Sequence, residues 1–183
     1  QLPMVVVAGA RSGVGATTAA VNLAAAIADG GDRVLLVDAA EDGRDLADLA
    51  GVARELEHSI ADILCAKCTA ADAIVAGPVG VRVLANRSCG LGKRRSASRR
   101  DAATCSREGQ QKLLDEIDSL SDEIDLVIVD AGSGLTAWTR RLWLSAQCVV
   151  LVTTADDASV MDAYSTMKHS TADGIRPPVR LLV

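Results

Sequence analysis

A glycine-rich segment near the start of the chain has the residue types and spacing of a loop that binds phosphate groups. Gly13, Gly15 and Thr17 follow an apolar run at Met4–Ala8 and precede a helical pattern. In the pattern G-x-x-x-x-G-K-[ST], backbone N–H groups surround phosphate oxygens, the lysine adds positive charge, and the hydroxyl reaches Mg²⁺. Here Ala16 occupies the lysine position. The sequence therefore predicts a phosphate-binding loop that keeps its shape and lacks its main charge.

Two aspartates at the ends of apolar segments complete the expected site. Asp38 follows one such segment, and Asp130 ends Leu126–Asp130, which has the character of a Walker B strand. A carboxylate in this place reaches Mg²⁺ through bound water. We therefore expect Thr17, Asp38 and Asp130 to hold Mg²⁺ when ATP or ADP is bound. The residues expected to bind the nucleotide are Arg11, Ser12, Gly13, Val14, Gly15, Ala16, Thr17 and Thr18.

Apolar segments rich in Val, Leu and Ile alternate with helical patterns along the chain. Most of the apolar segments are short and apolar on both faces, as expected of strands buried in a parallel sheet. This alternation predicts an α/β fold, a doubly wound, mostly parallel sheet flanked by helices, with ligands at the carboxyl ends of the strands. The expected strands are Met4–Ala8, Arg33–Val37, Val81–Ala85, Leu126–Asp130, Cys148–Thr153 and Val179–Val183. The expected helices are Thr17–Asp29, Ser59–Cys65, Gln110–Leu120, Thr136–Leu144 and Asp157–Lys168.

The composition restricts the class of protein. With 183 residues, 49% of them hydrophobic, the chain can form one soluble domain with a sizeable core. A net charge of −5 and an aromatic content of only 2% argue against nucleic-acid binding through a basic or stacking surface. We see no apolar run long enough to span a bilayer. We expect a single domain over residues 1–183 that stops before the natural C-terminus of such a domain.

The five cysteines follow no regular spacing, so we interpret them as reduced thiols of a cytoplasmic protein. Cys65 and Cys68 have the spacing of a redox or zinc pair. With Cys89 and Cys105 they would supply the four thiolates of a zinc site. We prefer ordinary free thiols, because no second closely spaced pair is present.

Residues 86–109 form a basic loop insertion in which Gly and Ser separate the charged residues. A solvated surface loop is the simpler interpretation. The alternative is a docking site for an acidic partner or a nucleic-acid backbone. Its basic residues are Lys93, Arg94, Arg95, Arg99, Arg100 and Arg107.

The phosphate-loop segment Gly13–Ala24 closely resembles that of the MinD/ParA group of deviant Walker ATPases, and Val34–Ala39 is similar to the group's second strand. Further along, His58–Leu64, Gly77–Leu84 and Val152–Asp157 are similar to the flagellar-number regulator branch, called FlhG or FleN. The resemblance covers nearly the whole chain except the basic loop. A second relative is the pilus-assembly localiser branch (TadZ/CpaE), whose members can carry altered P-loops.

The resemblance implies a regulator that controls the number or placement of a polar surface organelle, the flagellum, through protein partners. A signal-recognition-type GTPase and a transcriptional activator are the partners it suggests. It also implies a homodimer and a location in the cytoplasm or peripherally at the inner membrane or cell pole. Membrane association would require a segment that this chain lacks, and nucleic acid is not an expected partner.

Three departures from the family pattern affect the expected activity. Besides Ala16, Arg11 stands where the family has a signature lysine that reaches the phosphates of the other subunit, and Ala40 stands where a second acidic residue positions the attacking water. Arg11 and Asp38 remain the only catalytic candidates. Because the loss of one transition-state donor lowers a rate by roughly 10²–10³-fold, we predict weak or absent ATP hydrolysis. The alternative is a working ATP-dependent dimerisation switch in which Arg11 replaces the lysine.

Two tryptophans, Trp138 and Trp143, lie in the helix expected at Thr136–Leu144. In the family this region contributes to the dimer face and to partner contacts. The sequence leaves two interpretations open, an interface role and ordinary packing in the core.

Overall fold

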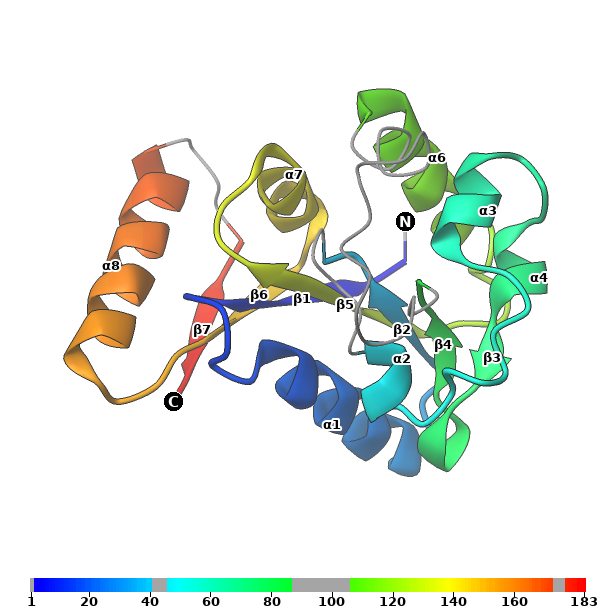
Figure 1. Cartoon of the computed structure of the whole chain (residues 1–183), viewed down its shortest axis with the longest axis horizontal. Helices are drawn as coiled ribbons and strands as arrows, with labels where there is room; N and C mark the ends of the chain where they lie inside the picture. Colours follow the sequence, from blue (N-terminus) through cyan, green and yellow to red (C-terminus); the bar gives the residue numbers. More distant parts are fainter. Residues whose placement is uncertain (1, 41–45, 87–105, 173–176) are drawn as a thin grey trace.

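The protein forms one seven-stranded sheet (Figure 1). The structure is a computed structural model that describes residues 2–40, 46–86, 106–172 and 177–183. The strands lie in the order β3-β4-β2-β5-β1-β6-β7. Every neighbouring pair is parallel except β3 and β4. This arrangement confirms the predicted α/β fold with a mostly parallel sheet. The strands are β1 (Met4–Gly9), β2 (Val34–Asp38), β3 (Val75–Ala76), β4 (Arg82–Leu84), β5 (Leu126–Ser133), β6 (Cys148–Val152) and β7 (Val179–Leu182).

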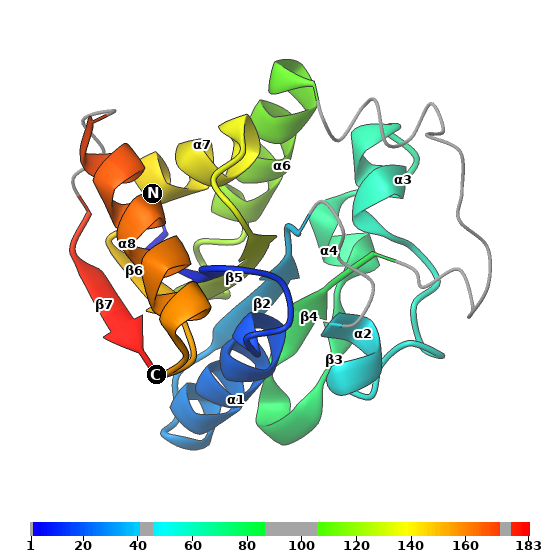
Figure 2. The ribbon, with the colours of Figure 1, turned by 60° about the vertical axis from the view of Figure 1, so that its left-hand side comes forward.

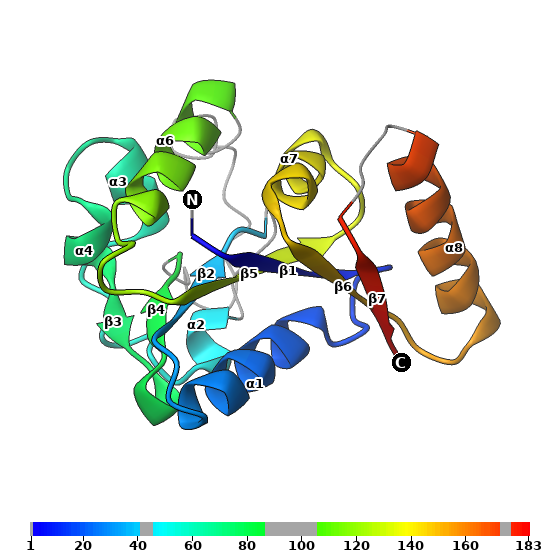
Figure 3. The ribbon, with the colours of Figure 1, turned by 180° about the vertical axis from the view of Figure 1, so that it is seen from behind.

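Helices cover both faces of the sheet (Figures 1 and 3). Helices α1 and α2 pack on one face, and α3, α4, α6 and α7 pack on the other. Helix α8 lies at the end of the sheet formed by β6 and β7 (Figure 2). The helices are α1 (Ala16–Asp29), α2 (Leu46–Leu49), α3 (Ile60–Leu64), α4 (Ala70–Ala73), the 3₁₀ turn η1 (Pro78–Gly80), α6 (Arg107–Asp118), α7 (Ala137–Ser145) and α8 (Asp157–Ala172).

Helix α1 lies close to the sheet because small side chains face it. Ala16, Ala20 and Ala24 recur every four residues, are buried, and pack in one cluster with Val7 of β1 and Ile128 of β5. Side chains four residues apart lie on the same face of a helix. This packing places the first turn of α1 directly after the carboxyl end of β1, where the phosphate loop is expected.

Four short elements of the structure are not predicted from the sequence. Helices α2 and α4, the 3₁₀ turn η1 and strand β3 have between two and four residues each. Segments of this length are too short to show a helical or strand periodicity. Capping supplies the local signal instead, as in α4, where the Thr69 hydroxyl accepts a hydrogen bond from the backbone N–H of Asp72 at 3.3 Å.

The C-terminal end of the sheet differs from expectation in two ways. Among the described strands, β7 pairs only with β6. Its side chains Leu181 and Leu182 are 52% and 45% exposed, so β7 is an edge strand and is not buried on both faces. Helix α8 continues to Ala172, four residues beyond the predicted end at Lys168. The helix continues because no glycine or proline lies between Lys168 and Gly174.

The predicted basic loop ends earlier than expected, because α6 begins at Arg107. The Ser106 hydroxyl caps this helix by accepting a hydrogen bond from the Gly109 backbone N–H at 2.9 Å. Most of the loop, including Lys93, Arg94, Arg95, Arg99 and Arg100, lies outside the described residues. Within the described part of the chain, no helix is both long and apolar enough to cross a membrane.

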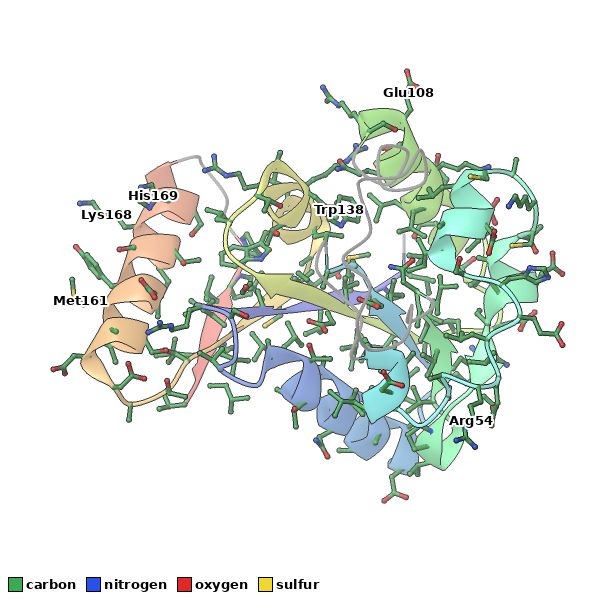
Figure 4. All side chains as sticks on the ribbon, in the orientation of Figure 1. Arg54, Glu108, Trp138, Met161, Lys168 and His169 are labelled. Atoms are coloured by element: carbon green, nitrogen blue, oxygen red, sulfur yellow. The ribbon has the colours of Figure 1, made fainter. Side chains whose placement is uncertain are left out.

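Both tryptophans of α7 belong to the core. Trp138 is 3% exposed and Trp143 is fully buried, so the core interpretation holds and the interface interpretation is wrong. The indole Nε1 of Trp138 donates a buried hydrogen bond to the carbonyl oxygen of Ala39 at 2.9 Å (Trp138 is labelled in Figure 4). This bond ties α7 to the segment that leaves β2. In contrast, the Nε1 of Trp143 has no hydrogen-bond partner among the described residues.

An ion pair joins the starts of the neighbouring strands β2 and β5. Arg33 Nη2 lies 2.6 Å from Asp125 Oδ1, and Arg33 Nε donates to Asp125 Oδ2 at 3.0 Å. The paired guanidinium lowers the pKa of Asp125 to about 2. This contact fixes the end of the sheet opposite the phosphate loop.

The Asp125 pair predicts a pH-dependent stability. A carboxyl whose pKa is lower in the folded state stabilises the protein above its unfolded pKa, here 3.8, and loses that contribution as the pH falls through about 2. We therefore expect wild type to be more stable than Asp125→Asn at pH 6, and the difference to shrink progressively below pH 4. Urea unfolding of both variants from pH 6 to pH 2.5 measures it. A difference that stays constant over this range would contradict the assignment.

The hydrogen bond of Trp138 predicts unequal costs for two similar substitutions. Trp138→Phe leaves the buried Ala39 carbonyl without its donor, which costs about 1–3 kcal/mol in addition to lost packing. Trp143→Phe is the matched control, because it removes similar volume and no hydrogen bond between described residues. Denaturant unfolding is expected to show the larger loss of stability in Trp138→Phe. Equal losses would mean that the bond to Ala39 adds nothing to stability.

Candidate functional site

A pocket of about 430 Å³ lies at the carboxyl ends of β1 and β5, where the fold places ligands. Residues 11–18 form one wall and residues 130–133 form another. Ala40, Leu46, Leu49, Thr136 and Thr139 complete the lining. All eight residues expected to bind a nucleotide therefore meet in one place.

The glycines of the loop give it the shape of an anion cradle. Gly13 and Gly15 have φ values of +84° and +91°, a left-handed conformation that favours glycine. No described atom lies within 4 Å of the position that a Cβ atom would take at either residue, so the backbone there is open to a ligand. Gly15 is also the N-cap of α1 and has no side chain to occupy the free N–H groups of the first turn. These amides and the positive end of the helix dipole suit a phosphate group.

The candidate magnesium residues divide into two groups. Thr17 and Asp130 both line the pocket, and Asp130 is 1% exposed with one carboxylate oxygen accepting from the Gly132 N–H at 3.1 Å. Asp38 is equally buried and lies beside Asp130 in the strand register, but it is not among the described lining residues. The structure therefore brings Thr17 and Asp130 to the pocket wall and places Asp38 next to Asp130 in the neighbouring strand.

A protein-only metal site is absent from the described residues, where no group of three His, Cys, Asp or Glu side chains could hold an ion. Mg²⁺ usually keeps several water ligands and binds through one or two protein groups plus substrate phosphates. The Thr17 hydroxyl and the Asp130 carboxylate suit that mode. Their arrangement fits a metal that arrives together with a nucleotide.

Two walls of the pocket touch at Ala40. Gly132 has a φ of +68°, and a Cβ atom added to it would lie 2.9 Å from the Cβ of Ala40. Gly132 is therefore required both by its backbone conformation and by this close approach. The segment after β2 is held in this place from the other side by the Trp138 hydrogen bond to Ala39. The sequence alone does not reveal this role of Trp138, because the bond joins residues that are 99 positions apart.

Arg11 is the only basic residue among the described residues that line the pocket. Its guanidinium forms ion pairs with two carboxylates, 3.7 Å from Nε to Asp162 Oδ2 and 4.0 Å from Nη1 to Asp156 Oδ1. Asp156 precedes α8 and Asp162 lies within it. The one cation expected to compensate for Ala16 is thus engaged by acidic groups of the same chain.

The alternative zinc site gains no support from the described residues. Cys65 and Cys68 are free thiols, and burial raises the pKa of Cys68, which disfavours the thiolate that zinc needs. Cys89 and Cys105 lie outside the described residues. Free thiols remain our interpretation of the pair that is described.

Comparison with known proteins identifies the protein family of this chain. The AAA domain family matches residues 3–170. The antiactivator FleN of Pseudomonas aeruginosa is 30% identical over 170 residues, which are 93% of this chain and 57% of FleN. The chain therefore spans a little over half the length of this relative.

Two solved structures share the fold. MinD in the MinC:MinD complex of Aquifex aeolicus has a TM-score of 0.79 and 23% identity, over 98% of this chain and 67% of that one. MinD of Pyrococcus horikoshii complexed with Mg-ADP has a TM-score of 0.73 and 23% identity, over 99% of this chain and 68% of that one. At this identity the likeness concerns the fold. With nearly the whole chain matched, the protein belongs to the AAA domain family and, within it, to the MinD/ParA-like P-loop ATPases.

Proposed function

We propose that this chain is the nucleotide-binding part of a MinD/ParA-type regulator that binds ATP or ADP with Mg²⁺ and hydrolyses ATP weakly or not at all. Through protein partners it would control the number or placement of flagella. The observation that carries the proposal is the open backbone cradle at Gly13 and Gly15, which persists although the lysine is absent. Backbone N–H groups need no side chain to bind a phosphate.

The roles that we propose for individual residues follow from this pocket. Residues 11–18 would surround the phosphates, Thr17 would offer its hydroxyl to Mg²⁺, and Asp130 would hold a metal-bound water. Asp38, beside Asp130 in the strand register, would act on the same ion through a further water. Bound Mg²⁺ would neutralise phosphate charge, for which Arg11 is the one basic side chain among the described residues that line the pocket.

Weak hydrolysis follows from the charges that the pocket lacks. Ala16 provides no cation, Arg11 is paired with two carboxylates, and Ala40 provides no acidic group to position a water molecule. Phosphoryl transfer depends mainly on positioning and on charge neutralisation. Loss of one donor alone lowers the rate by roughly 10²–10³-fold. Nucleotide binding without appreciable turnover is therefore the behaviour that we propose.

The biological role is proposed from the relatives. FleN is an antiactivator, and MinD of Aquifex aeolicus forms a complex with MinC, so proteins of this group act by binding other proteins. We propose the same for this chain, as a dimer in the cytoplasm or peripherally at the inner membrane or cell pole. A role in pilus placement remains the alternative within this group of proteins.

A working ATP-dependent dimerisation switch is the second candidate, because Arg11 lines the pocket and could serve as its cation. The two hypotheses differ in what Arg11→Ala does. If Arg11 replaces the lysine, this variant loses ATP-driven dimerisation and hydrolysis. If the chain is a nucleotide-binding regulator without turnover, phosphate release is already at background before the substitution. Light scattering and a phosphate-release assay with Mg-ATP separate the two outcomes.

Restoring the lysine tests the proposed function directly. We expect Ala16→Lys to bind Mg-ATP about 10- to 100-fold more tightly than the native sequence, because a hydrogen bond to a charged group is worth about 1.5–3 kcal/mol. Calorimetric titration of Mg-ATP and Mg-ADP measures both affinities.

The matched control for this test is Ala16→Met, which adds a long side chain without charge and should not gain affinity. Detectable binding by the native chain would support a nucleotide-binding site. Binding regained only in Ala16→Lys would contradict nucleotide binding by the native chain and would mean an intact pocket that no longer takes ATP. No binding by either the native chain or a folded Ala16→Lys variant would contradict the proposed phosphate site as well.

A further inference from the structure

We propose that Cys65 and Cys68 form a thiol-modification site that reacts with a low-molecular-weight disulfide, such as glutathione disulfide, and closes a reversible bond between the two sulfur atoms. Both cysteines are free thiols in the structure. Neither is among the described residues that line the nucleotide pocket, so the site does not rest on the proposed function. In the cytoplasm, where we place this protein, disulfides are usually transient and often sense the redox state.

The chain between the two cysteines is a short turn that ends α3. The backbone N–H of Ala66 donates to the carbonyl oxygen of Ile63 at 2.9 Å. The next N–H, of Lys67, donates to the carbonyl oxygen of Asp62 at 3.0 Å. Ala66 has a φ of +55°, a conformation that favours glycine. Three residues of chain span at most about 10 Å, and a disulfide joins Cα atoms about 5.5–6 Å apart. A change confined to this turn is therefore enough to bring the two sulfur atoms together.

The two thiols differ in their access to solvent. Cys65 is exposed, whereas Cys68 is half-buried and packs against the hydrophobic core. Burial raises the pKa of Cys68, and the carboxylates of Asp62 and Asp72 add to this effect. Because the thiolate is the reactive form, Cys68 is poorly suited to attack a disulfide in solution. Cys65 is therefore the thiol that reacts first, and Cys68 reacts second from within the protein.

The reaction consists of two thiol–disulfide exchanges. The Cys65 thiolate attacks one sulfur of glutathione disulfide, the S–S bond breaks, and the first glutathione leaves as a thiolate. The Cys68 thiolate then attacks the Sγ of Cys65, forms the Sγ–Sγ bond, and releases the second glutathione thiolate. The protons of the two cysteines pass to the two leaving thiolates. The pair of cysteines is thereby oxidised, and glutathione disulfide is reduced to two thiols.

The turn between the cysteines is tied to α6 on both sides, and α3 and α4 lie beside this helix (Figures 1 and 3). Before the turn, Lys112 Nζ donates to the carbonyl oxygen of Ile63 at 2.9 Å. After the turn, Glu116 Oε2 accepts from the backbone N–H of Ala70 at 2.9 Å. Lys112 and Glu116 are four residues apart and so lie on one face of α6. A turn that changes shape on oxidation therefore acts directly on α6.

Tryptic peptide mapping of the full chain tests the proposal. Trypsin cleaves after Lys67, so a bond between Cys65 and Cys68 leaves two peptides joined through their sulfur atoms. After incubation with glutathione disulfide, we expect this joined pair to be the main modified product, with the mass of the protein lowered by two hydrogen atoms. No modification, a glutathionyl group that stays on Cys65, or a bond from Cys65 to Cys89 or Cys105 would overturn the proposal.

Single substitutions separate the two exchanges. In Cys68→Ser the reaction should stop after the first exchange, so the protein gains the mass of one glutathionyl group at Cys65. In Cys65→Ser most of the reaction at this site should be lost. Cys148→Ser is the matched control, because Cys148 is a half-buried free thiol in β6 with no second cysteine nearby in the sequence, and it should leave the joined pair unchanged. Modification of Cys68 in Cys65→Ser as fast as that of Cys65 in Cys68→Ser would overturn the assigned order.

Amide NMR of the reduced and oxidised protein tests the effect on α6. The Ala70 N–H, which is bonded to Glu116, should shift on oxidation and return when the disulfide is reduced. The Thr139 N–H, which is bonded to the Thr136 hydroxyl in α7, serves as the control and should stay in place. An Ala70 resonance that does not move when the disulfide forms would overturn the link between the two cysteines and α6.

Discussion

The site depends on one geometric constraint, the sharp passage of the chain from β1 into α1. Gly13 and Gly15 adopt left-handed backbone conformations, and α1 follows at once with its first amides free. The buried alanine face of α1 packs on the sheet and holds the helix in place after β1. The backbone N–H of Ala10 also donates a hydrogen bond to the carbonyl oxygen of Val152 at 2.8 Å. Because backbone groups form the cradle, its shape survives the loss of a side chain charge.

The charges around this cradle explain why shape and activity separate. In the described lining, Asp130 is acidic and Arg11 is basic, and Arg11 is paired with carboxylates outside the pocket. Asp38 places another carboxylate beside Asp130 in the neighbouring strand. A site of this kind favours an anion that brings its own cation, which is how Mg²⁺ and a nucleotide bind together. Catalysis demands more, because developing charge must be neutralised by groups that are already in place.

The sequence predicted the main strands and helices because their apolar patterns are long enough to define a period, and the glycines and aspartates fall where parallel strands end. It missed α2, α4 and β3, which are too short to show a pattern. It predicted the strand at Val179–Val183 but not its place at the edge of the sheet, because an apolar edge strand and a central strand have the same composition. Neither the Trp138 bond to Ala39 nor the pairing of Arg11 could be predicted, since both join residues far apart in the chain through tertiary packing.

The central claim is that the loop backbone, without its lysine, still binds the phosphates of a nucleotide. The most direct measurement is an amide NMR titration of the ¹⁵N-labelled chain with Mg-ADP. The account predicts that the largest shifts fall on Gly13, Gly15, Ala16 and Thr17, with smaller changes at Gly132. Absence of shifts in this loop at millimolar Mg-ADP, or shifts confined to a different surface, would contradict it.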